Sequence, residues 1–334
     1  MVRWKVLVGA ASALLFLVYL NNTSSFAPAM TGAPTVLVHR GIAQQVNWDT
    51  ADASGCIADQ IFPPKHEYLE NTIASMRAAF DRGANVVEFD IHRTRDNRFA
   101  VFHDRQLECR TDGQGAPREH SLEELQALDI GYGYTADGGR TYPFRGKGVG
   151  LMPSIDEVFQ TFPGKSFLID VKSNDPRDGR LLASQLSKLP PEQRSSLMVF
   201  GRGSTLEALR ESLPEIRMFS VGSIANCLVR YIGYGWTGMV PGSCENAPLF
   251  VPVNIAPWLW GWPNLFMERM RSSGSSIVLV GAFSGRNFAR GLDTLEHLAR
   301  LPGNFDGGIW TNDVELVTTT LRKTSDRKQD PSLH

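Results

Sequence analysis

Two carboxylate residues, Glu88 and Asp90, lie two positions apart inside the apolar stretch 86–91. Successive side chains of a β-strand alternate between its faces, so both carboxylates project to the same side. The same spacing recurs at Asp170 and Lys172, at the end of a second apolar stretch. Carboxylates gathered at one place repel each other unless a cation compensates them. Oxygen ligands without cysteine favour a hard ion, Mg²⁺ or Ca²⁺.

These three acidic residues therefore predict a metal site. The alternative is that each carboxylate pairs with a nearby Arg or Lys, or lies on a solvated strand edge.

Two histidines supply acid–base capacity next to this cluster. His39 follows the apolar run 35–38, and His103 follows the run 99–102. An unperturbed imidazole titrates at about pH 6.5, so it donates or accepts a proton under mild conditions. We expect both rings at the carboxyl ends of strands, where barrels carry their active sites. The remaining histidines lack this placement and are interpreted as surface or packing residues: His66, His92, His120, His297 and His334.

A phosphoryl group is the ligand that the neighbouring basic residues predict. Arg40 follows His39, and the glycine after it allows close backbone approach. A guanidinium binds phosphate oxygens in a fork, and Lys172 adds a second positive charge beside the predicted metal. An ion pair between Arg40 and Glu70 is the structural alternative, and it is compatible with phosphate binding.

Eight short apolar runs predict strands, and helical patterns lie between most of them. The strands are expected at 35–38, 86–91, 99–102, 166–171, 197–200, 217–221, 276–280 and 308–310. The helices are expected at 71–82, 122–128, 155–162, 180–188, 205–212, 264–273, 294–301 and 314–322. Strands that alternate with helices favour a closed (β/α)8 TIM barrel. The runner-up is an open doubly wound sheet, but no glycine-rich phosphate loop follows the first strand.

Long connections follow the first and third predicted strands, at 41–69 and 105–152. Loops of this length in a barrel lie at its carboxyl face and are usually functional. Segment 227–263 is also irregular, and it ends in a stretch with Trp258, Trp260 and Trp262 in alternation. These aromatic residues suit an acyl groove or a membrane interface, or they form a packed loop over the barrel.

Length and charge limit the classes of protein. A chain of 334 residues holds one large α/β domain with extensions, and its net charge of −1 argues against a nucleic-acid partner. Residues 6–20 form an apolar run after Arg3 and Lys5, which is typical of a signal peptide or a membrane anchor. A buried N-terminal helix is the remaining alternative. We expect a signal peptide or anchor at 1–29, a catalytic barrel at 30–322 and a polar tail at 323–334.

Export agrees with the four cysteines, Cys56, Cys109, Cys227 and Cys244, which show no close metal-ligand spacing. An oxidising compartment favours two disulfides, and three connectivities are possible. We favour Cys56–Cys109 and Cys227–Cys244, with free buried thiols as the alternative for the second pair. The predicted location is periplasmic or extracellular, with possible membrane association through the N-terminus.

Four motifs in order resemble the glycerophosphodiester phosphodiesterase family. They are "HRG" at 39–41, "ENT" at 70–72, "GANVVEFDIHRTRDNRFAVFHD" at 83–104 and "CRTDGQG" at 109–115. The resemblance implies a TIM barrel with a carboxylate-held divalent metal, and hydrolysis of a glycerophosphodiester to glycerol 3-phosphate and an alcohol.

Carried over by motif, His39 and His103 become the acid–base pair, Glu88 and Asp90 become metal ligands, and Arg40 becomes a phosphate contact. The family usually has Glu-x-Lys on the fourth strand. Here Asp170 stands at that place, with a side chain one methylene shorter. The closing segment "FDGGIWTNDVE" at 305–315 resembles the family's last motif, with Asn312 interpreted as an insertion before Asp313.

The implied mechanism has two steps, with His39 as first base and His103 as first acid. A small-molecule or lysolipid phosphodiester is the expected substrate. Two alternatives stay open at this point. One is a phospholipase D-like, sphingomyelinase D-like or lysophospholipid-cleaving enzyme on the same barrel. The other is an exported binding protein whose site has decayed.

Overall fold

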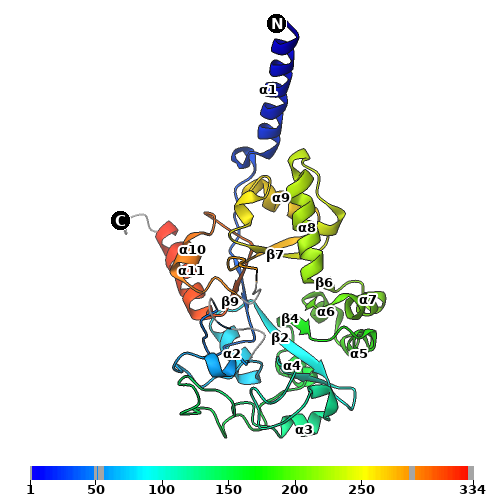
Figure 1. Cartoon of the computed structure of the whole chain (residues 1–334), viewed down its shortest axis with the longest axis vertical. Coiled ribbons are helices and arrows are strands. Elements are labelled where there is room, and N and C mark those ends of the chain that lie inside the picture. Colours follow the sequence, from blue (N-terminus) through cyan, green and yellow to red (C-terminus); the bar gives the residue numbers. More distant parts are fainter. Residues whose placement is uncertain (1, 49–50, 52–55, 286–289, 330–334) are drawn as a thin grey trace.

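Parallel strands and helices alternate through most of the chain in the computed structural model, which describes residues 2–48, 51, 56–285 and 290–329. Within these residues, eight strands lie in the order β6-β5-β4-β2-β1-β9-β8-β7, with every neighbouring pair parallel (Figure 1). Their bounds are β1 Thr35–Val38, β2 Val86–Arg93, β4 Ser166–Val171, β5 Met198–Phe200, β6 Arg217–Phe219, β7 Pro248–Pro252, β8 Ser276–Val280 and β9 Gly308–Thr311. The predicted (β/α)8 barrel is confirmed.

The barrel closes where the two ends of this path meet. Phe219 of β6 and Phe250 of β7 stack with ring centroids 4.8 Å apart and an interplanar angle of 18°. Stacked aromatic side chains bury large apolar areas, so they seal the wall at the place where strand pairing stops. The barrel is therefore nearly closed, and the seal is made by side chains.

Two strand predictions need correction. The run predicted at 99–102 forms β3 (Phe99–Val101), but this strand pairs antiparallel with β2 and lies outside the barrel wall. The eighth wall strand is β7, which the sequence analysis missed. Pro248 and Pro252 begin and end β7. Proline is depleted in strands and tolerated at their ends, so the pattern resembled a loop.

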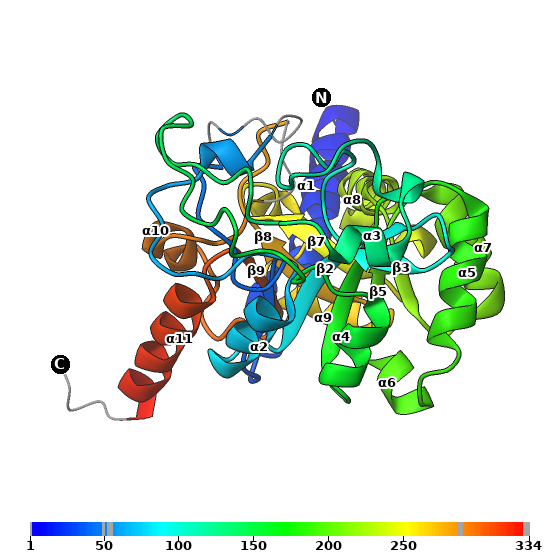
Figure 2. The same cartoon turned by 90° about the horizontal axis from the view of Figure 1, so that it is seen from below.

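Helices surround the strands, as Figure 2 shows from below the view of Figure 1. Their bounds are α2 Ile73–Asp81, α3 Leu122–Gln126, α4 Ile155–Thr161, α5 Pro176–Leu186, α6 Pro191–Ser195, α7 Gly203–Ser212, α8 Val221–Tyr234, α9 Asn264–Ser272, α10 Leu295–Ala299 and α11 Val314–Gln329. The expected helices are present with small shifts of their ends. Helix α11 continues to Gln329, so the first part of the expected polar tail is helical. Residues 330–334, including His334, lie outside the described residues.

Helix α8 was not predicted. It begins at Val221, where a strand was expected to end, and it runs into the segment 227–263 that was expected to be irregular. Its start is set by a capping box: the Ser220 hydroxyl accepts from the Ser223 backbone N–H at 3.1 Å, and the Ser223 hydroxyl accepts from the Ser220 N–H at 2.9 Å. The strand therefore stops at Phe219, two residues before the predicted end at Val221. Gly222 and Gly233 near its two ends weakened the helical pattern in the sequence.

Both predicted disulfides, Cys56–Cys109 and Cys227–Cys244, are present. The first joins the two long loops that follow β1 and β3. Beneath these loops lies a second apolar cluster, separate from the barrel core, that includes Leu107, Tyr134 and Phe144. The second disulfide ties α8 to the short helix η5 (Gly242–Cys244). The long loops are thus packed and cross-linked where they cover the barrel.

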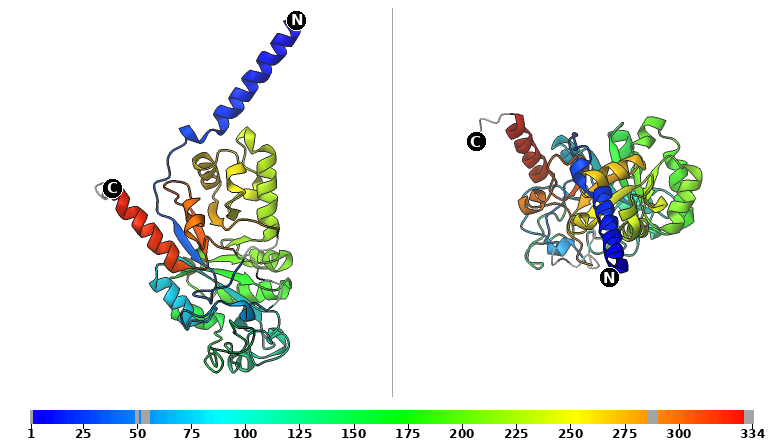
Figure 3. Two further views of the ribbon diagram at one scale, coloured as in Figure 1. Left: turned by 60° about the vertical axis from the view of Figure 1, so that its left-hand side comes forward. Right: turned by 90° about the horizontal axis from the view of Figure 1, so that it is seen from above.

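The N-terminal helix α1 (Val2–Asn22) projects away from the barrel, beside α8 and α9 (Figures 1 and 3). Its segment from Arg3 to Asn22 has a mean hydropathy of 1.6 and is not buried against the rest of the described chain. By length and composition it suffices to cross a membrane, and a signal sequence passes the same test. The alternative of a buried N-terminal helix is therefore wrong.

Candidate active site

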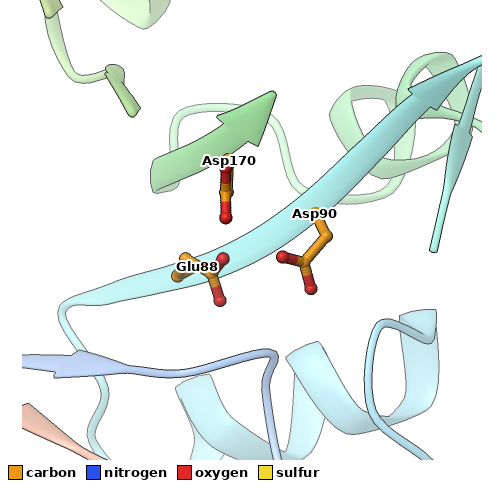
Figure 4. Close-up of side chains that lie close together, drawn as sticks. All are labelled: Glu88, Asp90 and Asp170. Atoms are coloured by element: carbon orange, nitrogen blue, oxygen red, sulfur yellow. The ribbon is translucent and has the colours of Figure 1, made fainter. Parts of the chain in front are cut away.

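Three carboxylates converge inside the mouth of the barrel. Glu88 and Asp90 project from β2, and Asp170 projects from the neighbouring strand β4 (Figure 4). The parallel register pairs Asp90 with Asp170, so the two side chains stand at the same height on adjacent strands. One oxygen from each of the three residues lies within 4.8 Å of the others. The shorter Asp170 side chain still reaches the cluster, because the strand pairing places it there.

Two basic side chains partly compensate this acidic cluster. The Lys172 ammonium lies 2.6 Å from Asp90 Oδ1 and also contacts Asp170 Oδ2. Arg40 Nε lies 3.2 Å from Asp90 Oδ2, and Asn71 donates to the same oxygen at 2.8 Å. Burial opposes ionisation of Asp90, but Lys172 and Arg40 outweigh it and hold its pKa well below the ordinary value. The ion pairs with Arg or Lys that the sequence offered as the alternative to a metal site are thus present, with Arg40 and Lys172 at Asp90 and with Lys172 at Asp170.

Glu88 has a different environment. Its Oε2 accepts a hydrogen bond from the Arg40 backbone N–H at 2.9 Å and lies 4.0 Å from His39 Nε2. Burial, reinforced by the charge of Asp90, raises the pKa of Glu88 well above its ordinary value. A buried carboxylate in this condition takes up a proton or a cation. An oxygen-rich cluster with one under-compensated carboxylate therefore fits a hard divalent cation.

Arg40 is held by strained backbone and by an ion pair. Its φ is 58°, in the left-handed region, and its Nη1 donates to Glu70 Oε1 at 2.9 Å. The predicted ion pair between Arg40 and Glu70 is therefore present. Gly41 also has a positive φ of 71°, and a Cβ there would lie 2.7 Å from the Ser75 hydroxyl. The glycine thus permits close packing on helix α2, whereas the sequence suggested that it makes room for a ligand.

His39 stands at the carboxyl end of β1, as predicted, and an amide fixes its tautomer. Asn312 Nδ2 donates to Asp293 Oδ2 at 2.8 Å, so Asn312 Oδ1 faces His39 and accepts from its Nδ1–H at 2.7 Å. The lone pair then lies on Nε2, the nitrogen that faces Glu88. Burial, with a smaller contribution from Arg40, holds the pKa of His39 well below its ordinary value. The free ring is a neutral base.

His103 reaches the barrel mouth by a different route from the one predicted. Strand β2 extends beyond the barrel rim to Arg93, and antiparallel β3 returns along it. The Phe102 N–H donates to the Asp90 carbonyl at 3.0 Å, which brings the next residue, His103, to the level of the acidic cluster. The expectation of a wall-strand end was wrong, but the hairpin delivers the ring to the same place.

The His103 ring pairs with a carboxylate. Its Nδ1 lies 2.6 Å from Asp104 Oδ1, and Arg110 Nε donates to Asp104 Oδ2 at 2.7 Å. Arg110 also pairs with Glu70 at 2.9 Å. Burial, with the charges of Arg40 and Lys172, lowers the pKa of His103 to about 4. Buried ion pairs thus run from His103 through Arg110 and Glu70 to Arg40 at the acidic cluster.

His39 and His103 line one cavity of about 250 Å³ at the barrel mouth, together with Glu88, Asp170 and Lys172. The opposite wall of this cavity is apolar and consists of Leu168, Phe200, Phe219, Val221, Ile224, Phe250, Val280 and Trp310, with Trp48 and Ile57 from the loop after β1. A larger open space of about 1440 Å³ continues outward from His103 and Lys172. Six of the seven predicted site residues line the smaller cavity, and the seventh, Asp90, contacts two of them, Arg40 and Lys172.

The residues that orient these groups had no predicted role. Asp104 and Arg110 lie inside the quoted motifs but received no role, and Asn71 belongs to the "ENT" motif. Asn312 was treated as an insertion, whereas it contacts His39 directly. Asp293 carried no sequence signal, because it lies in a loop far along the chain. Their roles depend on side chains meeting across distant segments.

Residues 39–189 match the model of the Glycerophosphoryl diester phosphodiesterase family. This segment belongs to that family. The matched residues include all seven predicted site positions, and His39 is the first of them. The resemblance inferred from the motifs is therefore confirmed. All predicted site residues lie in the matched segment, whereas Asn312 and Asp293, which support His39, lie outside it.

Curated relatives agree with this assignment. A glycerophosphodiester phosphodiesterase from Bacillus subtilis is 29% identical over 172 residues, which are 47% of this chain and 57% of that protein. One from Caldanaerobacter subterraneus is 32% identical over 103 residues, covering 31% and 39% of the two chains. A human lysophospholipase D is 27% identical over 192 residues, covering 56% and 55%. The chain thus spans about half the length of these curated relatives.

Solved structures share the fold over most of the chain. The glycerophosphoryl diester phosphodiesterase domain of a Mycobacterium tuberculosis protein superposes with a TM-score of 0.63 at 13% identity, covering 86% of this chain and 99% of that one. An Oleispira antarctica phosphodiesterase, solved with the product sn-glycerol-3-phosphate, has a TM-score of 0.56 at 16% identity, covering 87% and 97%. At these identities the likeness establishes the fold.

Proposed function

We propose that the protein is a metal-dependent phosphoric diester hydrolase that converts glycerophosphodiesters to glycerol 3-phosphate and an alcohol. One observation carries the proposal: His39 and His103 line the same small cavity as Glu88, Asp170 and Lys172. Two imidazoles beside a carboxylate cluster can supply both proton transfers of a phosphodiester cleavage. The names of the relatives support the same reaction class.

Glu88, Asp90 and Asp170 would hold the cation, whose identity as Mg²⁺ or Ca²⁺ their oxygen donors leave open. When bound, such an ion neutralises charge that develops on phosphate oxygens. Lys172 and Arg40 add positive charge beside it. Because Arg40 is clamped by Glu70 and by its own backbone hydrogen bond to Glu88, its guanidinium is pre-organised for an anion.

His39 accepts the proton of the substrate's 2-hydroxyl at Nε2, and the hydroxyl oxygen attacks phosphorus. The bond from phosphorus to the alcohol oxygen breaks, and His103 protonates that oxygen. In the second step water attacks the cyclic phosphate, the ring bond to the 2-oxygen breaks, and the two histidines exchange roles. The low pKa of His103 leaves it neutral in the free protein, and the anionic phosphodiester beside it raises that pKa toward the value an acid requires.

The test is turnover of glycerophosphocholine by the His39→Ala and His103→Ala variants. Each variant should lose nearly all activity while its circular dichroism and melting temperature stay close to those of the parent. His120 is a partly exposed histidine on the loop before α3, so His120→Ala is the matched control and should keep full activity. Parent-like rates in both active-site variants would refute the proposal.

A second candidate substrate class is favoured by the apolar wall of the cavity. Phe200, Phe219 and Phe250 face the catalytic groups across a space with little polar lining. Apolar walls of this kind suit an acyl chain, and one relative is named a lysophospholipase D. A panel of glycerophosphocholine and lysophosphatidylcholines of rising chain length decides between the classes. Rates that increase with chain length support the lysolipid, and rates that fall support the soluble diester.

We also propose that residues 30–322 form the catalytic unit and that the chain is exported. The apolar helix α1 and the two disulfides support export to an oxidising compartment.

A further inference from the structure

Exposed apolar side chains gather around the carboxyl end of α1. They come from four elements: helix α8 and the short helices η1 (Ser24–Phe26), η4 (Gly235–Thr237) and η6 (Ala256–Trp258), with the turn after η4. Phe26 is 79% exposed and Trp258 is 77% exposed, which is unusual for large apolar residues in a folded domain. The α1 collar, as we name it, consists of Phe26, Val229, Ile232, Trp236, Met239 and Trp258.

The end of α1 is fastened to the same elements. The Asn21 and Asn22 amides both donate to the Trp236 carbonyl, at 3.0 and 2.7 Å. Arg269 of α9 donates to the Asn21 carbonyl at 2.6 Å and to Asn22 Oδ1 at 3.1 Å. These bonds fix the point at which α1 leaves the folded domain, next to Trp236 of the collar.

The segment after α1 also completes the fold. Pro263 precedes α9 and offers no side-chain cap for its first turn. The Ser24 hydroxyl takes that role from a distance, accepting from the backbone N–H groups of Asn264 at 2.7 Å and Leu265 at 3.2 Å. Cleavage at the end of the segment 1–29 predicted as a signal peptide or anchor would remove Ser24 and this cap. The structure therefore favours retention of α1.

The tryptophan-rich segment divides into partly buried and exposed side chains. Trp260 donates its indole N–H to the Ile232 carbonyl at 2.9 Å, and Trp262 packs on Phe266 with ring centroids 5.9 Å apart. Only Trp258 of these three points outward with most of its surface free. The packing residues thus hold the loop to α8, and Trp258 is presented beside α1.

Charge is scarce over this whole region. Residues 221–263 contain Arg230 and Glu245 as their charged residues, and residues 6–39 contain none of Asp, Glu, Lys or Arg. A soluble partner protein would meet a polar rim around an apolar centre. A bilayer interface instead favours tryptophan and aliphatic side chains around a spanning helix.

We propose that the α1 collar is a membrane-docking surface, seated in the headgroup and acyl boundary of the bilayer that α1 crosses. The collar continues directly from α1, which commits the surface to lipid. The proposal does not depend on the reaction that the barrel catalyses.

Helix α8 connects this surface to the barrel mouth. Val221 and Ile224 in its first turns line the cavity with His39 and His103. Val229 lies eight residues after Val221, which is about 12 Å along the helix axis at a rise of about 1.5 Å per residue. Docking of the collar therefore holds the barrel mouth close to the lipid surface, where a membrane-derived diester would arrive.

The experiment places an environment-sensitive fluorophore at single added cysteines in the full chain, reconstituted in phosphatidylcholine and phosphatidylglycerol vesicles. The probe positions are Val229→Cys and Met239→Cys. The matched control is Glu123→Cys, at an exposed position of α3, which lies at the far end of the molecule from α1 in Figure 1. We expect blue-shifted, several-fold brighter emission at 229 and 239, quenched by lipids that carry a quencher near the headgroup, and no change at 123.

Each other outcome overturns the proposal. Equal emission at all three positions means that the collar does not contact lipid selectively. A shift that grows with protein concentration at fixed lipid means that a second copy of the chain covers the collar. Intact mass of the membrane-bound protein gives an independent reading: a chain that retains α1 is expected, and a chain that begins near residue 30 contradicts docking beside a spanning helix.

Discussion

The two candidate catalytic histidines differ in what holds them. His39 donates from Nδ1 to a neutral amide, Asn312, whereas His103 pairs with a carboxylate, Asp104. An amide oxygen fixes the tautomer and stabilises a positive charge on the ring less than a carboxylate does, which suits a base. A carboxylate stabilises the imidazolium, which suits the group that donates a proton. The proposed roles of His39 as first base and His103 as first acid rest on this difference.

The role of Asn312 leads to a prediction about rate. Asn312→Ala leaves Nδ1 without its acceptor, so the ring can hold its proton on Nε2 and lose the base. We expect kcat to fall roughly 10- to 100-fold with little change in KM, as for other residues that orient a catalytic histidine. Asn85→Ala is the matched control, since Asn85 accepts from the Val36 N–H at 2.7 Å at the start of the strands, away from the barrel mouth. That variant should lose stability and keep kcat. Equal kcat losses in both would show that Asn312 acts only through the fold.

Asp104 leads to a prediction about acid stability. Burial alone would raise the pKa of the Asp104 carboxyl, but Arg110 and His103 hold it well below its ordinary value of about 3.9. Because the folded pKa is depressed, the ionised carboxylate stabilises the fold above about pH 4, and this contribution is lost as the pH falls further. Asp104→Asn should therefore lower the free energy of unfolding at pH 7 and reduce its dependence on pH below 5. Urea unfolding at several pH values measures both. Parallel curves for parent and variant would contradict the assignment.

At the scale of elements, the sequence predicted the type of most segments correctly where the apolar period was clear. Strands β1, β4 and β8 agree with the prediction to the residue, because each is a buried run of apolar, mostly branched residues. The prediction was wrong where two local sequence signals favoured different structures. The prolines around β7 concealed a wall strand, and Ser220 began a helix where β-branched residues suggested a longer strand. The antiparallel β3 was assigned to the wall because a three-residue hairpin strand has the same composition as a barrel strand.

The two disulfides connect elements differently and should differ in their contribution. Cys56–Cys109 spans 53 residues of sequence and Cys227–Cys244 spans 17. In the chain-entropy model, loss of the shorter link costs about 3 kcal/mol, and loss of the longer one costs about 1 kcal/mol more. Serine double variants, unfolded thermally under identical conditions, test this order.

The first disulfide also borders the larger space at the barrel mouth, so its removal should lower the activity as well. Removal of the second disulfide should leave kcat close to that of the parent. A reversed order of stability would show that strain or residual structure outweighs loop length.

At the scale of the whole molecule, the barrel gathers residues that are distant in sequence. Residues 39–172 carry most of the motifs, and for that part the sequence predicted the acidic cluster, both histidines and the ion pair of Arg40 with Glu70. The support for His39 comes from Asn312 and Asp293, because strand β9 closes the barrel next to β1. A contact across such a distance depends on closure of the sheet, which no local pattern records. The same holds for Ser24, which caps a helix 240 residues later.

Cation binding should therefore be visible in the stability of the whole barrel, because the three carboxylates join β2 to β4. An ion that binds only the folded state stabilises it by about 2.7 kcal/mol at a hundredfold excess over Kd. We expect Mg²⁺ or Ca²⁺ to raise the melting temperature of chelator-treated protein and to restore its activity.

The variant Glu88→Gln separates binding of the cation at this site from non-specific effects of salt. The pKa of Glu88 is raised by burial and by Asp90, so a neutral amide should stabilise the cation-free protein while it removes both the thermal shift and the activity. A Glu88→Gln protein that still shows the full shift would place the cation elsewhere, and a parent protein without any shift or chelator sensitivity would remove the metal from the proposed function.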